Sequence, residues 1–184
     1  MTENDAPAVL RRLQAGATLD EALALYDSLP PVRVEEMIGS WRGAGLPTGN
    51  PMDGLLEVYG WQGKRFDSPD EAHPLVFGGR RGLFSTNPAG LPLGAMVRAS
   101  PLLRLGPVAA LGRAAIALRR TRSPKARLRM IEYRGVPTAT MSYDALPIND
   151  HFRRVDERTL LGVMDLRGLQ NPFFFLLLRE EDGR

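Results

Sequence analysis

The sequence predicts a mainly β protein, an antiparallel β-barrel with helical additions. Residues 125–179 form short runs in which apolar residues recur at every second position, so each run places one face inward. Turn-forming residues such as Arg134-Gly135 separate the runs. The last run, 173–179, is apolar on both faces and predicts a strand covered on both sides. Five short antiparallel strands would expose edges and an apolar face unless the sheet closes, so we expect a closed or nearly closed barrel.

The predicted strands assign side chains to faces. The four strands before the last one cover residues 127–133, 138–143, 148–155 and 159–166. Ala139, Met141 and Tyr143 share one face of the second strand. In the third strand Ile148, Asp150 and Phe152 share a face, while His151, Arg153 and Val155 occupy the other. Gly162 interrupts the fourth strand and predicts a bulge or the close approach of another backbone.

The first part of the chain predicts short helices before the barrel. Residues 1–30 form a helical arm, in which Thr18 and Glu21 match a capping box at the start of a helix that ends before Pro30. Residues 31–184 form one barrel domain, with a first half at 33–100, a basic helix at 101–122 and the strand meander at 123–180. Within the first half we expect helical turns at 34–38, 53–59 and 68–71, and strands at 61–66 and 74–77.

The middle of the chain is strongly basic. No acidic residue occurs between Glu71 and Glu132, although the net charge of the whole protein is only +3. Val108, Leu111, Ala115 and Leu118 fall on one face of the predicted helix, with arginines opposite. Three interpretations fit: a solvated arginine face with the helix packed on the barrel, a lid that attracts an anionic ligand, and a patch at 98–129 that contacts anionic lipid. Aromatic residues for base stacking are scarce, which disfavours nucleic acid.

The composition excludes several kinds of site. The chain has no cysteine, so disulfides and thiolate chemistry are excluded. It has only two histidines, which argues against a multi-histidine metal site, and we expect no metal and no cofactor. We see no secretory signal and no apolar run of about 20 residues, so we expect a soluble cytoplasmic protein, with a homodimer left open.

Two parts of the chain resemble known bacterial sequences. Gly39-Ser-Trp41-Arg-Gly43, together with 61–66, resembles the GXWXG-motif family. Residues 126–179, with the strings at 143–154 and 162–168, resemble the uncharacterised C-terminal domain that accompanies that motif. The resemblance implies a lipocalin/calycin-like barrel. It implies no activity.

The resemblance also gives the short motif a structural role. In lipocalin-like barrels a tryptophan at the start of the first strand plugs the barrel, and a basic residue of the last strand lies across it. Here Trp41 would be the plug and Arg179 the cation that stacks on it. Gly39 and Gly43 would allow neighbouring backbone to approach closely.

Asp150 is the best candidate for a carboxylate inside the barrel, because it shares a face with Ile148 and Phe152. A buried carboxylate needs a partner, and Arg65, Arg153 and Tyr133 are candidates. His73, in contrast, is expected at the surface or at a helix cap.

Two main classes of function stay open. The first is binding of a small hydrophobic or amphipathic ligand, with or without an anionic head. The second is a cofactor-free isomerase, cyclase or hydrolase that would use Asp150, Tyr143 and His151. A peripheral membrane protein is a weaker third class. Met130 is expected to line the interior together with the candidate ligand-binding residues, which are Trp61, Arg65, Tyr133, Met141, Tyr143, Asp150, Phe152 and Met164.

Overall fold

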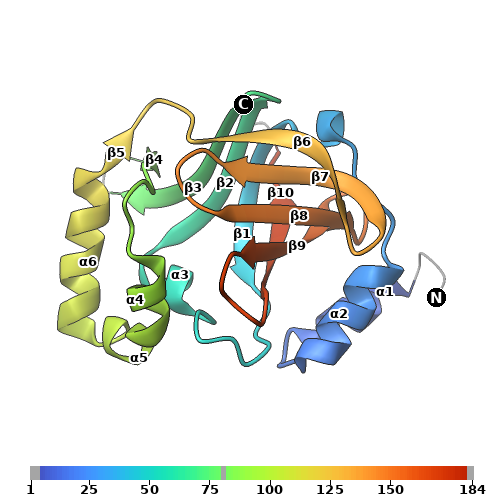
Figure 1. Ribbon diagram of the computed structural model, residues 1–184, viewed down its shortest axis with the longest axis horizontal. Helices are drawn as coiled ribbons and strands as arrows, with labels where there is room; N and C mark the ends of the chain where they lie inside the picture. Colours follow the sequence, from blue (N-terminus) through green and yellow to red (C-terminus); the bar gives the residue numbers. More distant parts are fainter. Residues whose placement is uncertain (1–4, 80–81, 182–184) are drawn as a thin grey trace.

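The computed structural model describes residues 5–79 and 82–181, and eight of its strands close into an antiparallel barrel (Figure 1). Going around the barrel, the strands follow the order β2, β1, β10, β9, β8, β7, β6 and β3, and β3 pairs with β2 to complete the circle. The seam between β3 and β6 is short, with Ala72 opposite Ala126 as its one paired position. Two short strands, β4 and β5, continue outward from β3. The strands are β1 Gly39–Gly45, β2 Trp61–Ser68, β3 Glu71–Gly79, β4 Gly82–Thr86, β5 Arg120–Thr121, β6 Ala126–Tyr133, β7 Val136–Tyr143, β8 Ile148–Arg154, β9 Thr159–Leu166 and β10 Phe173–Arg179.

The predicted barrel and its strand meander are confirmed. β6 to β10 match the five expected strands within a few residues at each end. Arg134 and Gly135 both have positive φ, 52° and 77°, as a two-residue hairpin of this kind requires. The strand alternation is also correct, because Ala139, Met141 and Phe152 point into the barrel core while Val155 packs outside it.

The last strand is covered on both sides because helices lie against the outside of the barrel. Phe173, Phe175 and Leu177 belong to the inner core. Phe174 and Leu176 instead pack with the helices α1 (Ala6–Leu13) and α2 (Leu19–Ser28). The predicted capping box at Thr18 and Glu21 is present at the start of α2. The sequence did not predict α1 as a complete helix.

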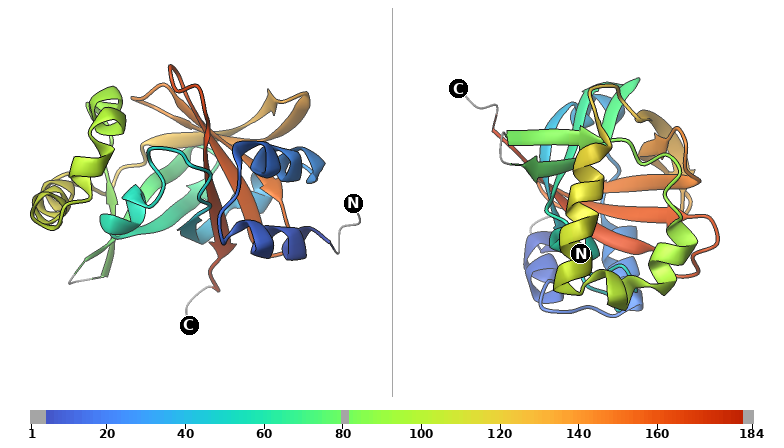
Figure 2. Two further views of the ribbon diagram at one scale, coloured as in Figure 1. Left: turned by 90° about the horizontal axis from the view of Figure 1, so that it is seen from below. Right: turned by 90° about the vertical axis from the view of Figure 1, so that its left-hand side faces the viewer.

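The helices α4, α5 and α6 lie at the opposite side of the molecule from α1 and α2 (Figures 1 and 2). A 3-10 helix η1 (Val34–Met37) precedes β1, and α3 (Leu55–Val58) precedes β2. The segment between β4 and β5 forms α4 (Leu93–Arg98), α5 (Ser100–Leu103) and α6 (Gly106–Leu118).

Several local expectations are corrected by the structure. Residues 68–71 form the turn between β2 and β3 rather than a helix, since Ser68 pairs with Glu71 across it. The helix expected at 53–59 covers only Leu55–Val58, and Asp53 lies before it, where its carboxylate accepts hydrogen bonds from the backbone N–H groups of Thr48 and Asn50. Of the three interpretations of the basic helix, the one that packs its apolar face on the barrel does not hold, because Leu111 and Leu118 of α6 are exposed.

Candidate functional site

One cavity lies between the inside of the barrel and α4. Its volume is about 80 Å³. The helix and the loop before it cover the barrel here, through Pro88, Leu91, Leu93 and Met96. The other lining residues come from the barrel strands and the loops around them: Met52, Leu56, Trp61, Lys64, Leu75, Tyr143, Leu146, Ile148, Asp150, Met164, Leu166, Phe173 and Phe175. The cavity is thus apolar except where Lys64, Asp150, Tyr143 and Trp61 contribute polar groups.

A buried ion pair lies at the wall of this cavity. Lys64 Nζ is 2.8 Å from Asp150 Oδ2, and the two side chains are only 3% and 1% exposed. The same ammonium donates a hydrogen bond to the carbonyl oxygen of Pro74 at 3.1 Å. It also lies 4.9 Å from the centre of the Phe175 ring. The charge of Asp150 is therefore compensated inside the barrel, by Lys64 rather than by Arg65, Arg153 or Tyr133.

A backbone irregularity explains why Lys64 rather than Arg65 points inward. With regular alternation from Trp61, residues 63 and 65 would face the interior. The pairing of β2 with β3 shifts register on both sides of Gly63, which has φ 142°. A Cβ at Gly63 would lie 1.9 Å from the carbonyl oxygen of Trp41, so only glycine fits. The shift turns Lys64 and Phe66 inward and Arg65 outward.

The polar groups at the cavity differ in how well they are satisfied. Burial raises the pKa of Asp150, and Lys64 and Tyr143 oppose that rise. Burial, together with the nearby Asp150 carboxylate, raises the pKa of Tyr143 well above its usual value. Lys64 contacts Asp150 Oδ2 at 2.8 Å, whereas Asp150 Oδ1 has no hydrogen-bond partner within the described chain. The buried indole N–H of Trp61 likewise has no acceptor there.

The structure brings together half of the predicted ligand-binding residues. Trp61, Tyr143, Asp150 and Met164 line the cavity. Met141 and Phe152 are fully buried in the barrel core and do not line it. The predicted interior position of Met130 is wrong, because Met130 is 48% exposed.

Two predicted residues lie on the outside of the barrel, beneath α2, instead of in the cavity. The rings of His151 and Tyr133 stack there with centroids 4.0 Å apart. His151 Nδ1 is 2.8 Å from the Thr140 hydroxyl. Burial lowers the pKa of His151 to about 4. His151 therefore belongs to the outer packing layer and cannot act with Asp150.

The other expected partners of Asp150 also face outward. Arg65 contacts Asp67 at 3.0 Å and His73 at 2.9 Å on the outer surface of β2 and β3. His73 is only 2% exposed, so its predicted surface position is wrong. Arg153 is buried on the outer face and donates a hydrogen bond to the carbonyl oxygen of Leu29 at 3.0 Å. None of these three residues reaches the cavity, because each lies on the outward side of its strand.

The short glycine-tryptophan motif lies outside the cavity. The guanidinium of Arg179 stacks over the Trp41 ring at 4.3 Å, the arrangement that the resemblance implies. The Trp41 indole donates to the carbonyl oxygen of Met37 at 2.7 Å, and Arg179 donates to the carbonyl oxygens of Ile38 and Glu36. Here an indole and a cation hold η1 against the barrel.

The glycines of the motif make room for neighbouring side chains, rather than for neighbouring backbone as expected. A Cβ at Gly43 would lie 2.3 Å from the Trp61 ring, and one at Gly39 would lie 3.4 Å from the Arg179 guanidinium. Gly162 in β9 has the same role, because a Cβ there would lie 2.4 Å from the Phe175 ring. The pairing of β9 with its neighbours shows no bulge at Gly162. Two glycines thus make room for two aromatic rings that line the cavity.

Residues 5–79 and 82–181 contain neither a cluster of metal-ligating side chains nor a membrane-spanning helix. No group of three or more histidine, aspartate or glutamate side chains is arranged to hold a metal ion. No helix in these ranges has the length and apolar character needed to cross a membrane.

The fold and the site define a class of protein: a closed antiparallel barrel with a helical cover over an apolar cavity. Residues 24–82 match the GXWXG protein family, and residues 124–179 match a domain of unknown function, DUF4334. A crystal structure of a protein from Thermomonospora curvata is 31% identical, with a TM-score of 0.69, over 97% of this chain and 99% of that one. No curated protein matches the chain. The chain belongs to the GXWXG family and carries its uncharacterised C-terminal domain.

Proposed function

We propose that the protein binds a small apolar or amphipathic molecule in the cavity between the barrel and α4. The observation that carries this proposal is an apolar cavity in which the buried Trp61 indole N–H and Asp150 Oδ1 have no hydrogen-bond partner among the described residues. Unpaired buried polar groups cost about 1–3 kcal/mol each. A bound ligand that supplies the missing partners would recover part of that cost.

The polar groups favour a ligand with a neutral polar end. The positive charge of Lys64 is already compensated by Asp150 at 2.8 Å. A ligand carboxylate would add a second negative charge beside Asp150 without a cation of its own. A hydroxyl group can donate a hydrogen bond to Asp150 and accept one from the unpaired Trp61 indole. An alcohol or phenol therefore fits better than the anionic ligand that the basic middle segment suggests.

The cavity volume sets a condition on binding. About 80 Å³ is well below the roughly 300–1,000 Å³ of pockets that hold drug-sized ligands. Leu93 and Met96 of α4, together with Pro88 and Leu91 of the loop before it, cover the cavity outside the barrel. We therefore expect a longer ligand to displace α4 while its polar end remains near Asp150.

Native mass spectrometry of the purified protein tests this proposal. We expect a bound small molecule, and we expect Met96→Trp to remove it because the indole would fill the cavity. Leu111→Trp is the matched control, since Leu111 is exposed on α6 and should leave the ligand in place. With an added probe, decanol should bind more tightly than decanoate. A protein that carries no ligand and binds neither probe would contradict the proposal.

A second candidate, a cofactor-free enzyme, rests on the raised pKa of Asp150. A buried carboxylate beside a tyrosine is suited to general acid/base catalysis. In this case the ligand found in the wild-type protein would be a product. Asp150→Asn protein should then carry a different, unconverted molecule. The same molecule in both proteins would leave binding as the function.

A further inference from the structure

The outward face of α6 is apolar. Leu111 and Leu118 are 74% and 89% exposed, and the positions between them on this face are alanines. The opposite face makes the contacts with the rest of the protein. Ala109 is buried there, and Gly112 packs so closely on Tyr59 that a Cβ would lie 2.2 Å from the ring. Figure 2 shows α6 at the outer edge of the molecule, where no other element covers it.

Several arginines of the basic segment are occupied by the protein itself. Arg113 donates to the carbonyl oxygen of Val58 at 2.9 Å. Arg104 and Arg119 donate to backbone carbonyl oxygens of the loops near residues 51–53 and 87–89. These side chains hold the helices against the barrel. They leave the exposed side of α6 without a charged residue.

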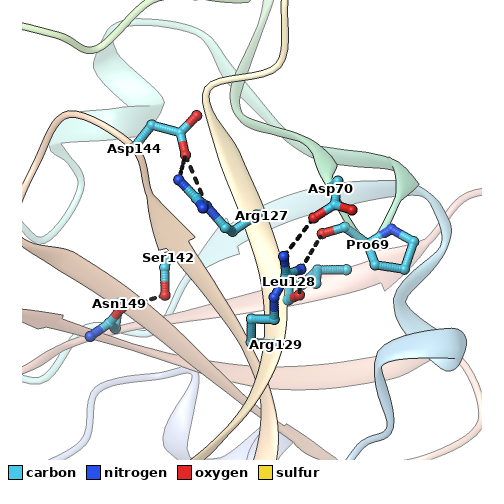
Figure 3. Close-up of polar contacts among 8 residues, drawn as sticks. All are labelled: Pro69, Asp70, Arg127, Leu128, Arg129, Ser142, Asp144 and Asn149. Carbon is cyan, nitrogen blue, oxygen red and sulfur yellow. Dashed lines mark hydrogen bonds and ion pairs between the residues drawn. The ribbon is translucent and has the colours of Figure 1, made fainter.

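Other arginines near α6 have no acidic partner. Arg98, Arg120 and Arg122 are exposed, and within the described ranges no acidic side chain forms an ion pair with them. The arginines of β6 differ (Figure 3), since Arg127 pairs with Asp144 at 3.0 Å and Arg129 with Asp70 at 2.6 Å. Two of these arginines without an acidic partner, Arg120 and Arg122, lie just beyond the C-terminal end of α6.

We propose that α6 and the arginines that follow it form a docking surface for an anionic lipid bilayer. A helix of 13 residues with exposed leucines can lie in the plane of a membrane interface, with its apolar face in the acyl boundary. Arg120 and Arg122 directly follow it and can contact anionic headgroups. Exposed apolar surface of this kind needs a partner, and its charge is complementary to an anionic membrane.

A second copy of the chain fits this surface less well. Residues 72–131 contain no acidic residue, so two such faces would bring arginines together without carboxylates to pair with them. Membrane docking does not depend on the proposed ligand function. It would hold equally if the cavity bound nothing.

Vesicle flotation tests the proposal. We expect the full-length protein to float with vesicles that contain phosphatidylglycerol and to remain unbound with pure phosphatidylcholine. Salt at about 1 M should weaken this binding, because it shortens the Debye length to about 3 Å. Arg120→Gln/Arg122→Gln should lower partitioning about fivefold per arginine. The matched control is Arg127→Gln/Arg129→Gln, which removes the same charge from β6 and should have little effect.

The apolar contribution is tested separately. Leu111→Gln/Leu118→Gln should lower binding about tenfold per leucine. Met130→Gln, an exposed apolar position on β6, should leave it unchanged. Equal binding to both kinds of vesicle, or to neither, would overturn the proposal. So would a dimer in light scattering that Leu111→Gln/Leu118→Gln converts to a monomer, because the face would then belong to a second copy.

Discussion

The two tryptophans of this protein occupy different environments in one barrel. The Trp41 indole N–H has an acceptor at 2.7 Å, and the cation that stacks on its ring is itself bound to backbone carbonyls. The Trp61 indole N–H is buried without an acceptor in the described chain, and it lines the same cavity as the buried carboxylate of Asp150. The first region has the properties of a structural closure. The second has the properties of a site that a ligand completes.

The comparison predicts that Trp41 matters for stability alone. Trp41→Ala should lower the free energy of unfolding by about 3–5 kcal/mol, since it removes a buried ring and the platform for Arg179. Arg179→Lys is a milder variant and should cost about 1.5–3 kcal/mol through lost charged hydrogen bonds. Urea denaturation and decanol binding would be measured for both. Lost binding with unchanged stability would place Trp41 in contact with the ligand.

Removing one partner of the buried Lys64–Asp150 ion pair should destabilise the protein more than removing both partners. Lys64→Met leaves the Asp150 charge buried and unpaired, so we expect a loss of about 3–5 kcal/mol in unfolding free energy. Lys64→Met/Asp150→Leu should recover most of that loss, yet bind decanol poorly. Arg65→Met is the matched control at the neighbouring, outward-facing position and should change stability by less than about 1 kcal/mol. A double variant with wild-type affinity would show that the pair has no role in binding.

Gly43 connects the motif to the cavity. Gly43→Ala should push the Trp61 ring into the cavity, at a cost of about 1–3 kcal/mol and with weaker decanol binding. Gly45→Ala on the same strand is the control, because its Cβ would meet only the flexible Glu57 side chain. Unchanged affinity in Gly43→Ala would indicate that the position of Trp61 does not affect the site.

The buried His151 in the outer packing layer should make the stability of the protein depend on pH. Its pKa falls from 6.5 to about 4 in the folded protein, so the unfolded chain takes up the proton first as pH decreases. Stability should therefore fall by about 1–3 kcal/mol between pH 6.5 and pH 4. The His151→Gln variant should lack this loss of stability between pH 6.5 and pH 4. The raised pKa of Asp150 acts in the opposite direction, because it favours the folded state as pH falls, and it is unchanged in this variant. An NMR titration that gives His151 a pKa near 6.5 in the folded protein would contradict its placement in the buried outer layer.

The sequence predicted the architecture well where local rules act alone. Alternation and turn residues were sufficient for β6 to β10, because register in this meander is continuous apart from its hairpins. The same alternation correctly placed Asp150 inside and His151 outside. The prediction of a helical turn at 68–71 was wrong because Pro69 suits both a helix start and a tight turn.

The site was only partly predictable because the irregularity at one glycine reverses which side chains of β2 point into the barrel. The irregularity at Gly63 depends on the nearby carbonyl of Trp41, which belongs to another strand. A mid-strand glycine was the one available signal, and it would have favoured Lys64 over Arg65. The cover provided by α4 was not predictable, because it depends on tertiary packing against strands that are distant in the sequence, such as those that carry Tyr143 and Asp150.

Single-tryptophan fluorescence tests the difference between the two regions most directly. In Trp41→Phe protein the remaining indole is Trp61, and its emission should change saturably when decanol is added. In Trp61→Phe protein the remaining indole is Trp41, and its emission should stay constant over the same range. A response from Trp41, or no response from Trp61, would contradict the account.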